Sequence, residues 1–202
     1  MSLPIGHLLR AGTNDFVAGC SVSQLEAPCF GALVRADPGP GYGVYGLIYD
    51  IAIDDDGLVR QLVTAGNISP EVMQDNRERR IVPVELSVLT VGYVAADKIF
   101  HRLPPRPPLS LDVLNLCPVE ELARFTDAGA YGYFRHILRA QDVPTGELLA
   151  AHIQQAAAAH PDPAWSERAL GELITLLRDD YPTLMSVLAA LADAGAEAPA
   201  RG

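Results

Sequence analysis

The segment IVPVELSVLTVGYV (residues 81–94) decides the fold, because it is a long apolar run rich in β-branched side chains. Val, Ile and aromatic residues favour extended backbone, so the run predicts a β-strand. Its apolar residues do not alternate strictly with polar ones, which indicates that both faces of the strand are partly covered. We therefore expect a barrel strand that also packs against a neighbouring barrel or against helices.

Five further runs in the first half of the chain have the same apolar or alternating character. Turn-forming sequences separate them, among them Gly12-Thr13-Asn14-Asp15 and Asp37-Pro38-Gly39-Pro40-Gly41. Six short strands with such punctuation predict a small closed antiparallel β-barrel, since closure removes exposed strand edges. The expected strands are residues 5–10, 16–22, 30–35, 44–53, 81–94 and 99–103.

A different pattern interrupts the strands at residues 57–80. Leu58, Val59, Leu62 and Val63 have helical spacing, and Ser69-Pro70 is typical of a helix start. We therefore predict a helical insertion between two barrel strands.

The second half of the chain changes from a period of two to a period of 3.6. The change follows the segment Leu103-Pro104-Pro105-Arg106-Pro107-Pro108, whose prolines favour a stiff extended connector over a ligand for a partner domain. The clearest helical stripe beyond it is Leu170, Leu173, Ile174 and Leu177. The expected fold class is thus α+β, with a barrel domain over residues 1–115 and an all-helical domain over residues 116–202.

Composition limits the classes of function. The chain carries a formal net charge of −10, with 49% hydrophobic and 20% charged residues. This charge repels phosphate backbones, so we do not expect direct nucleic-acid binding. The longest apolar stretches are too short to span a membrane, and the N-terminal residues lack a signal-peptide pattern, so we expect a cytoplasmic protein. Three cysteines without a CxxC pair give no metal or disulfide signature, and we expect no cofactor.

Two glycine patterns bear on nucleotide binding. Residues 41–46, Gly-Tyr-Gly-Val-Tyr-Gly, match G-x-G-x-x-G, but prolines precede them and a predicted strand follows. A dinucleotide site needs a helix there, so a flexible turn that leads into a strand is the better interpretation. The P-loop pattern G-x-x-x-x-G-K-S/T does not occur in the sequence, which excludes a P-loop ATPase core.

A local basic cluster is the main candidate for a partner site. Arg77, Arg79 and Arg80 lie together, although Asp75 and Glu78 dilute their charge. We interpret the cluster as a solvated helix end in the first instance. If the first half of the chain holds a partner-binding site, these three arginines are its candidate residues.

Several of these segments resemble the HAS-barrel domain of HerA-type DNA translocases and ATP synthases. The similarity is carried by Ile5-Gly6-His7, by Phe16-Val17-Ala18-Gly19, by residues 44–51 (VYGLIYDI) and by the proline-rich exit at residues 103–108. It covers roughly residues 4–115. In HerA-type proteins a P-loop motor follows the barrel, whereas here a helical segment too short for that motor takes its place.

The resemblance implies a barrel that packs into ring assemblies and docks protein partners, with no catalytic residue to carry over. The leading hypothesis is therefore a non-catalytic module for self-association, or an adaptor for a separate HerA-type ATPase or nuclease in DNA processing. Two alternatives stay open. One is a hydrolase whose site assembles from dispersed residues such as His7, His101 and Asp54-Asp55-Asp56, and the other is a weak nucleic-acid-binding barrel.

Overall fold

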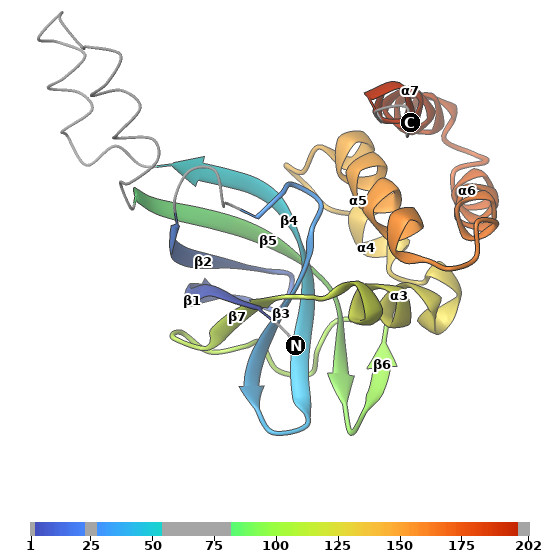
Figure 1. The fold of residues 1–202 in the computed structure, drawn as a ribbon. Coiled ribbons are helices and arrows are strands. Elements are labelled where there is room, and N and C mark those ends of the chain that lie inside the picture. The colour runs from blue at the N-terminus through green and yellow to red at the C-terminus, as the bar shows by residue number, and fades with distance from the viewer. Residues whose placement is uncertain (1–2, 23–27, 54–81, 198–202) are drawn as a thin grey trace, which may run out of the picture.

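The computed structural model describes residues 3–22, 28–53 and 82–197. Within these ranges an antiparallel β-barrel is followed by helices, as the sequence predicts (Figure 1). The strands are β1 (Leu3–Ala11), β2 (Asp15–Val22), β3 (Leu33–Gly39), β4 (Tyr42–Ile53), β5 (Val82–Ala95), β6 (Lys98–Phe100) and β7 (Val113–Leu116). The predicted helical insertion at residues 57–80 lies outside the described residues.

Six of these strands close into the barrel, in the order β2, β1, β7, β3, β4 and β5. Their pairings are antiparallel, and the β2–β5 ladder from Asp15↔Leu89 to Val22↔Val82 completes the ring. Closure supplies backbone hydrogen-bond partners on both sides of each barrel strand. The predicted six-stranded barrel is confirmed.

The sixth strand of the barrel is not the one that the sequence predicts. Residues 99–103 contribute only to β6, which pairs with β5 alone, whereas β7 pairs with both β1 and β3. The proline-rich segment therefore leads the chain back to the barrel instead of out of it. Proline has no backbone N–H to donate, so residues 104–108 cannot extend a ladder, and pairing resumes only at Val113.

The glycine-rich segment is a hairpin turn, as expected. β3 ends at Gly39, β4 begins at Tyr42, and Gly41 between them has a φ of 71°. Glycine adopts this left-handed conformation without steric cost, and a strand follows it, so the helix that a dinucleotide site requires is not formed at this position.

Small and branched side chains fill the barrel interior. Gly46 on β4 leaves the room that this packing needs, because a Cβ atom there would lie 2.9 Å from the Leu89 carbonyl oxygen and 3.1 Å from the Phe16 ring. The buried interior residues are Leu8, Phe16, Ala18, Cys20, Ala32, Val34, Ala36, Val44, Ile48, Val84, Leu86, Val88 and Leu114.

The outer face of β3, β4 and β5 is also buried, because the helices pack against it (Figure 1). Leu33, Tyr45, Leu47, Leu89 and Val91 point outward from the strands and share one apolar core with the helices. Apolar and polar residues do not alternate strictly in residues 81–94 for the reason that the sequence predicts. Both faces of β5 are covered, one by the barrel interior and one by helices.

The helical region consists of five described α-helices and one 3₁₀ turn. They are α3 (Val119–Asp127), η1 (Ala128–Tyr131), α4 (Phe134–Leu138), α5 (Thr145–Ala159), α6 (Trp165–Leu176) and α7 (Tyr181–Glu197). Trp165 at the start of α6 is fully buried and stacks on His160, with 4.5 Å between the ring centroids. In the predicted stripe, Leu173 and Leu177 are buried whereas Ile174 is half exposed.

A polar cluster ties α3 to the barrel wall. Arg35 on β3 forms salt bridges with Asp37 and with Glu121 of α3, and the Tyr45 hydroxyl donates a 2.8 Å hydrogen bond to Glu121. Asn115 on β7 donates to Asp37 at 2.9 Å. Burial and the neighbouring Glu121 carboxylate both raise the pKa of the Tyr45 hydroxyl, so Tyr45 remains a hydrogen-bond donor.

Two buried histidines lie between the barrel and the helices. His152 on α5 bonds through Nδ1 to the Gly31 carbonyl and through Nε2 to the Tyr133 hydroxyl, both at 3.2 Å. His101 bonds through Nε2 to the Phe125 carbonyl at 2.9 Å. Burial lowers the pKa of each imidazole to about 4, so both are neutral at pH 7. Because a carbonyl oxygen only accepts, the proton of His152 lies on Nδ1 and that of His101 on Nε2.

Candidate functional site

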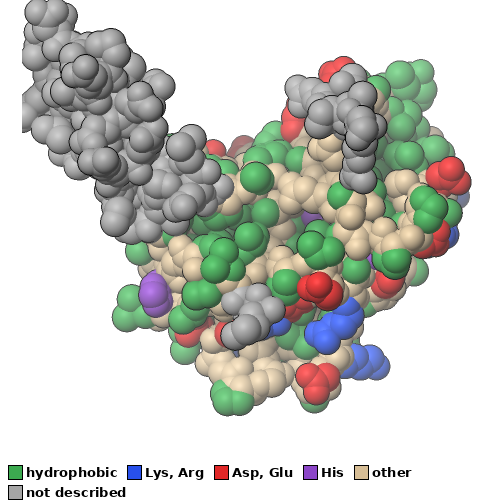
Figure 2. Space-filling model, viewed as in Figure 1, with side chains coloured by type: hydrophobic (Ala, Val, Ile, Leu, Met, Phe, Trp, Pro, Cys, Tyr) green, Lys and Arg blue, Asp and Glu red, His purple; other side chains and the backbone are tan. Residues whose placement is uncertain are grey.

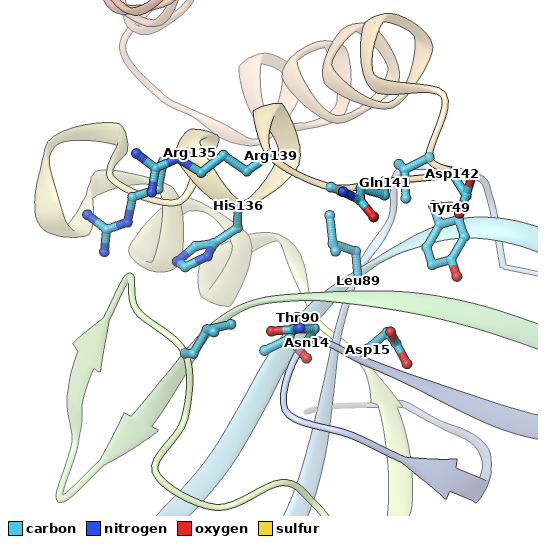
Figure 3. A pocket seen from close by; sticks show the side chains of 13 residues that line it. Asn14, Asp15, Tyr49, Leu89, Thr90, Arg135, His136, Arg139, Gln141 and Asp142 are labelled. Atoms are coloured by element: carbon cyan, nitrogen blue, oxygen red, sulfur yellow. The ribbon is translucent and has the colours of Figure 1, made fainter.

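A cleft of about 550 Å³ opens between the barrel and α4 (Figure 3). The barrel supplies Asn14 and Asp15 from the β1–β2 turn, Tyr49 from β4, and Leu89 and Thr90 from β5. The opposite wall comes from α4 and the segment that joins it to α5. This volume lies within the range typical of small-molecule sites, about 300–1,000 Å³.

One end of the cleft is basic. Arg135, His136 and Arg139 follow one another along α4 and its last turn, and Figure 3 shows them together above the barrel. Arg135 donates to the His101 carbonyl, which orients its guanidinium. Burial and the two neighbouring arginines lower the pKa of His136, so at neutral pH the formal charge of this end comes from the arginines.

The other end of the cleft is acidic. Asp15 comes from the β1–β2 turn and Asp142 from the α4–α5 connection, where its φ is 58°. Figure 3 places both carboxylates beside Tyr49, across Leu89 from the arginines. Within the described part of the chain, Asp15, Asp142 and Arg139 form no salt bridge or side-chain hydrogen bond.

An unsatisfied hydroxyl lies in the wall of the same cleft. Thr90 is fully buried, its backbone N–H donates to the Asn14 carbonyl at 2.8 Å, and its side-chain oxygen finds no hydrogen-bond partner among the described residues. A buried hydroxyl without a partner costs about 1–3 kcal/mol. The cleft thus presents charged groups of both signs, and its wall contains a buried hydroxyl without a partner among the described residues.

A second candidate site is an exposed apolar surface beside β1 and β7. It comprises Leu9 of β1, Leu109 and Leu111 of the β6–β7 loop, and Val113 of β7, and we call it the leucine surface. Backbone hydrogen bonds hold the loop against β1: Leu111 N–H donates to the Leu8 carbonyl, and Leu8 N–H to that of Asp112. Apolar side chains reach the molecular surface over both the barrel and the last helices (Figure 2).

Leu111 carries a conformational cost on this surface. Its φ is 72°, in the left-handed region that disfavours a leucine side chain, and 77% of the residue is exposed. The Asp112 carboxylate, which accepts from Leu109 N–H at 2.6 Å, helps to hold the turn. The fold therefore places a large apolar side chain in solvent although its backbone conformation is unfavourable.

A second hollow, of about 970 Å³, has an aromatic wall. Tyr93 lies between Tyr42 and Phe100, and the Arg102 guanidinium lies over the Tyr93 ring at 5.6 Å. The Tyr42 hydroxyl donates a 2.9 Å hydrogen bond to the Arg106 carbonyl. The proline-rich segment is therefore part of the fold here and forms one side of this hollow.

Of the candidate site residues singled out from the sequence, those that the structure describes do not line the cleft. Arg77, Arg79, Arg80 and Asp54-Asp55-Asp56 lie outside the described residues. His7 is exposed on β1, whereas His101 is buried against Phe125 and Tyr133, so the two do not share a site. Sequence reasoning missed the cleft because its residues come from five segments that are distant in the sequence. The only local signal was the i, i+4 spacing of Arg135 and Arg139.

Comparison with known proteins adds no assignment. No protein-family model matches the chain, and no curated protein is significantly similar to it. Among the described helices, none is both long enough and apolar enough to cross a membrane.

Proposed function

We propose that the chain is a non-catalytic interaction module of the HAS-barrel type, which docks a protein partner through the leucine surface. The partner is either a second copy of the chain or a HerA-type DNA translocase or its nuclease. The observation that carries the proposal is Leu111, an exposed leucine held at a positive φ beside other exposed apolar side chains. The resemblance of residues 4–115 to barrels that dock such partners supports it.

The geometry favours a protein partner over a small ligand at this surface. Leu9, Leu109 and Leu111 are each at least half exposed, and Leu109 also borders the hollow with the aromatic wall. Contiguous exposed apolar side chains of this kind mark protein contacts in many proteins. Among the described residues, the helices cover the outer face of β3, β4 and β5, whereas β1 and β7 present the exposed side chains of the leucine surface.

The substitution Leu111→Asn tests the proposal, because asparagine tolerates a positive φ while it removes the apolar side chain. We expect the variant to be as stable as the parent chain, or more stable by up to about 1 kcal/mol. We expect its association to weaken by about tenfold or more. Urea unfolding measures the first effect. Light scattering after gel filtration, alone and mixed with a HerA-type translocase or its nuclease, measures the second.

Ile174→Gln is the matched control, since Ile174 is an apolar residue of α6 that is 49% exposed away from the leucine surface. It should leave association unchanged. A parent chain that stays monomeric and forms no complex with either partner would contradict the proposal. Equal weakening by Leu111→Asn and Ile174→Gln would also contradict it, because the effect would then not be specific to the leucine surface.

A further inference from the structure

We propose that the cleft between the barrel and α4 binds a short zwitterionic peptide, with its carboxylate at Arg135 and Arg139 and its ammonium group at Asp15 and Asp142. This inference concerns residues that the leucine surface does not contain, so it stands or falls independently of the proposed function.

The first argument is the separation of charge within one hollow. The cleft holds two guanidinium groups and two carboxylates, yet the described residues form no salt bridge between them. Figure 3 shows the arginines at one end and the two aspartates at the other. A ligand that carries both charges can pair with both ends at once, whereas a simple anion or cation meets a like charge at one end.

The second argument is the Thr90 hydroxyl. It is fully buried in the cleft wall and has no partner among the described residues. Buried polar groups are nearly always hydrogen-bonded, and an exception is most simply explained by a missing partner. A peptide has amide groups between its two charged ends, which is the chemistry that a hydroxyl in this position can satisfy.

The third argument is the size and lining of the cleft. A volume of about 550 Å³ is ample for a small ligand of a few residues. Between the charged ends the lining is apolar, with Leu89, Ala140 and Val143. Small apolar side chains suit this middle section. Trialanine is therefore the probe of choice, since three extended residues span roughly 10 Å.

The test compares trialanine with two blocked forms, N-acetyl-trialanine and trialanine amide, by isothermal titration calorimetry on the full chain. We expect trialanine to bind about tenfold more tightly than either blocked form, because each block removes one charge pair. The N-acetyl form also represents the C-terminus of a protein, which brings only the carboxylate. If it binds as tightly as trialanine, the ligand is a chain terminus and the zwitterion proposal is overturned.

Two substitutions assign the ends of the cleft. Arg139→Gln should weaken trialanine and N-acetyl-trialanine by about tenfold and leave the amide unchanged. Asp142→Asn should weaken trialanine and the amide, and leave the N-acetyl form unchanged. Arg178→Gln is the matched control, because Arg178 is an exposed arginine outside the cleft. Absence of trialanine binding to the parent chain, or equal loss with Arg178→Gln, would overturn the proposal.

Thr90→Val provides a readout that does not depend on charge. In the free protein it removes an unsatisfied hydroxyl, so the midpoint of thermal unfolding should rise by about 2–4 °C. In the calorimeter the same variant should bind trialanine several-fold more weakly. A variant that is less stable than the parent would show that the hydroxyl already has a partner, and would count against the proposal.

Discussion

Lowering the pH from 7.5 to 5 is expected to reduce the free energy of unfolding by about 4 kcal/mol, through His101 and His152. Both imidazoles are buried, and burial lowers the pKa of each from 6.5 to about 4 in the folded protein. The unfolded chain therefore binds protons first as the pH falls. Stability is fully present above pH 6.5, is lost as the pH falls below it, and reaches its lower limit near pH 4. Each histidine contributes about 2 kcal/mol by pH 5.

Urea unfolding at the two pH values measures this loss. At pH 5 most aspartates and glutamates are still ionised, so the carboxylates contribute little to the change. The double variant His101→Gln, His152→Asn keeps a side-chain N–H for each acceptor carbonyl but cannot titrate. It should be less stable than the parent at pH 7.5 and should lose much less stability at pH 5. A parent chain that is equally stable at both pH values would show that the histidines are not buried in neutral form.

Gly46→Ala is expected to destabilise the barrel by about 3 kcal/mol. The new methyl group would enter a filled space, against the Val88 side chain and within 2.9 Å of the Leu89 carbonyl oxygen. β5 is paired on both sides at this point, so its backbone cannot move away without breaking a ladder. Thermal or urea unfolding measures the effect.

Gly171→Ala is the control for this substitution. A Cβ atom at Gly171 meets nothing within 4 Å, and the residue lies inside α6. The alanine there should stabilise the chain by about 0.5–1 kcal/mol, because glycine disfavours a helix interior. If both substitutions changed the free energy of unfolding in the same direction, the close approach of β4 and β5 at Gly46 would not limit the packing of the barrel.

The barrel was predictable because its signals are local. Each predicted strand is a run of branched and aromatic side chains, and each turn carries glycine, proline or asparagine, so neighbouring residues suffice to recognise them. The burial of both faces of β5 was also predictable, because apolar and polar residues do not alternate along a strand with two buried faces. The sequence left open whether a neighbouring barrel or helices cover the outer face. β7 was not predictable. It is four residues long, it follows prolines, and only its pairing with β1 and β3 makes it a strand.

The cleft and the leucine surface were not predictable for a related reason. Thr90 and Asp15 are 75 positions apart in the sequence, and only the β2–β5 ladder brings their strands together. Leu109 and Leu111 come just after the prolines, which the sequence analysis interprets as a stiff extended connector. The exposure of these leucines indicates a binding surface only because backbone hydrogen bonds hold the loop against β1. Both candidate sites thus arise from long-range pairing, which residue patterns do not report.

The position of β7 also affects how the chain reaches this structure during synthesis. β1 is made before the other barrel strands, but one of its two partners is the strand that contains Leu116, the residue that pairs with Leu3. The ribosome must therefore deliver the chain as far as Leu116 before the barrel can close. Until then β1 and β3 keep open edges, which are the features of a nascent chain that chaperones protect from aggregation. Such distant pairing is typical of slow folding, so a chain that stalls before Val113 should be a substrate for chaperones and proteases.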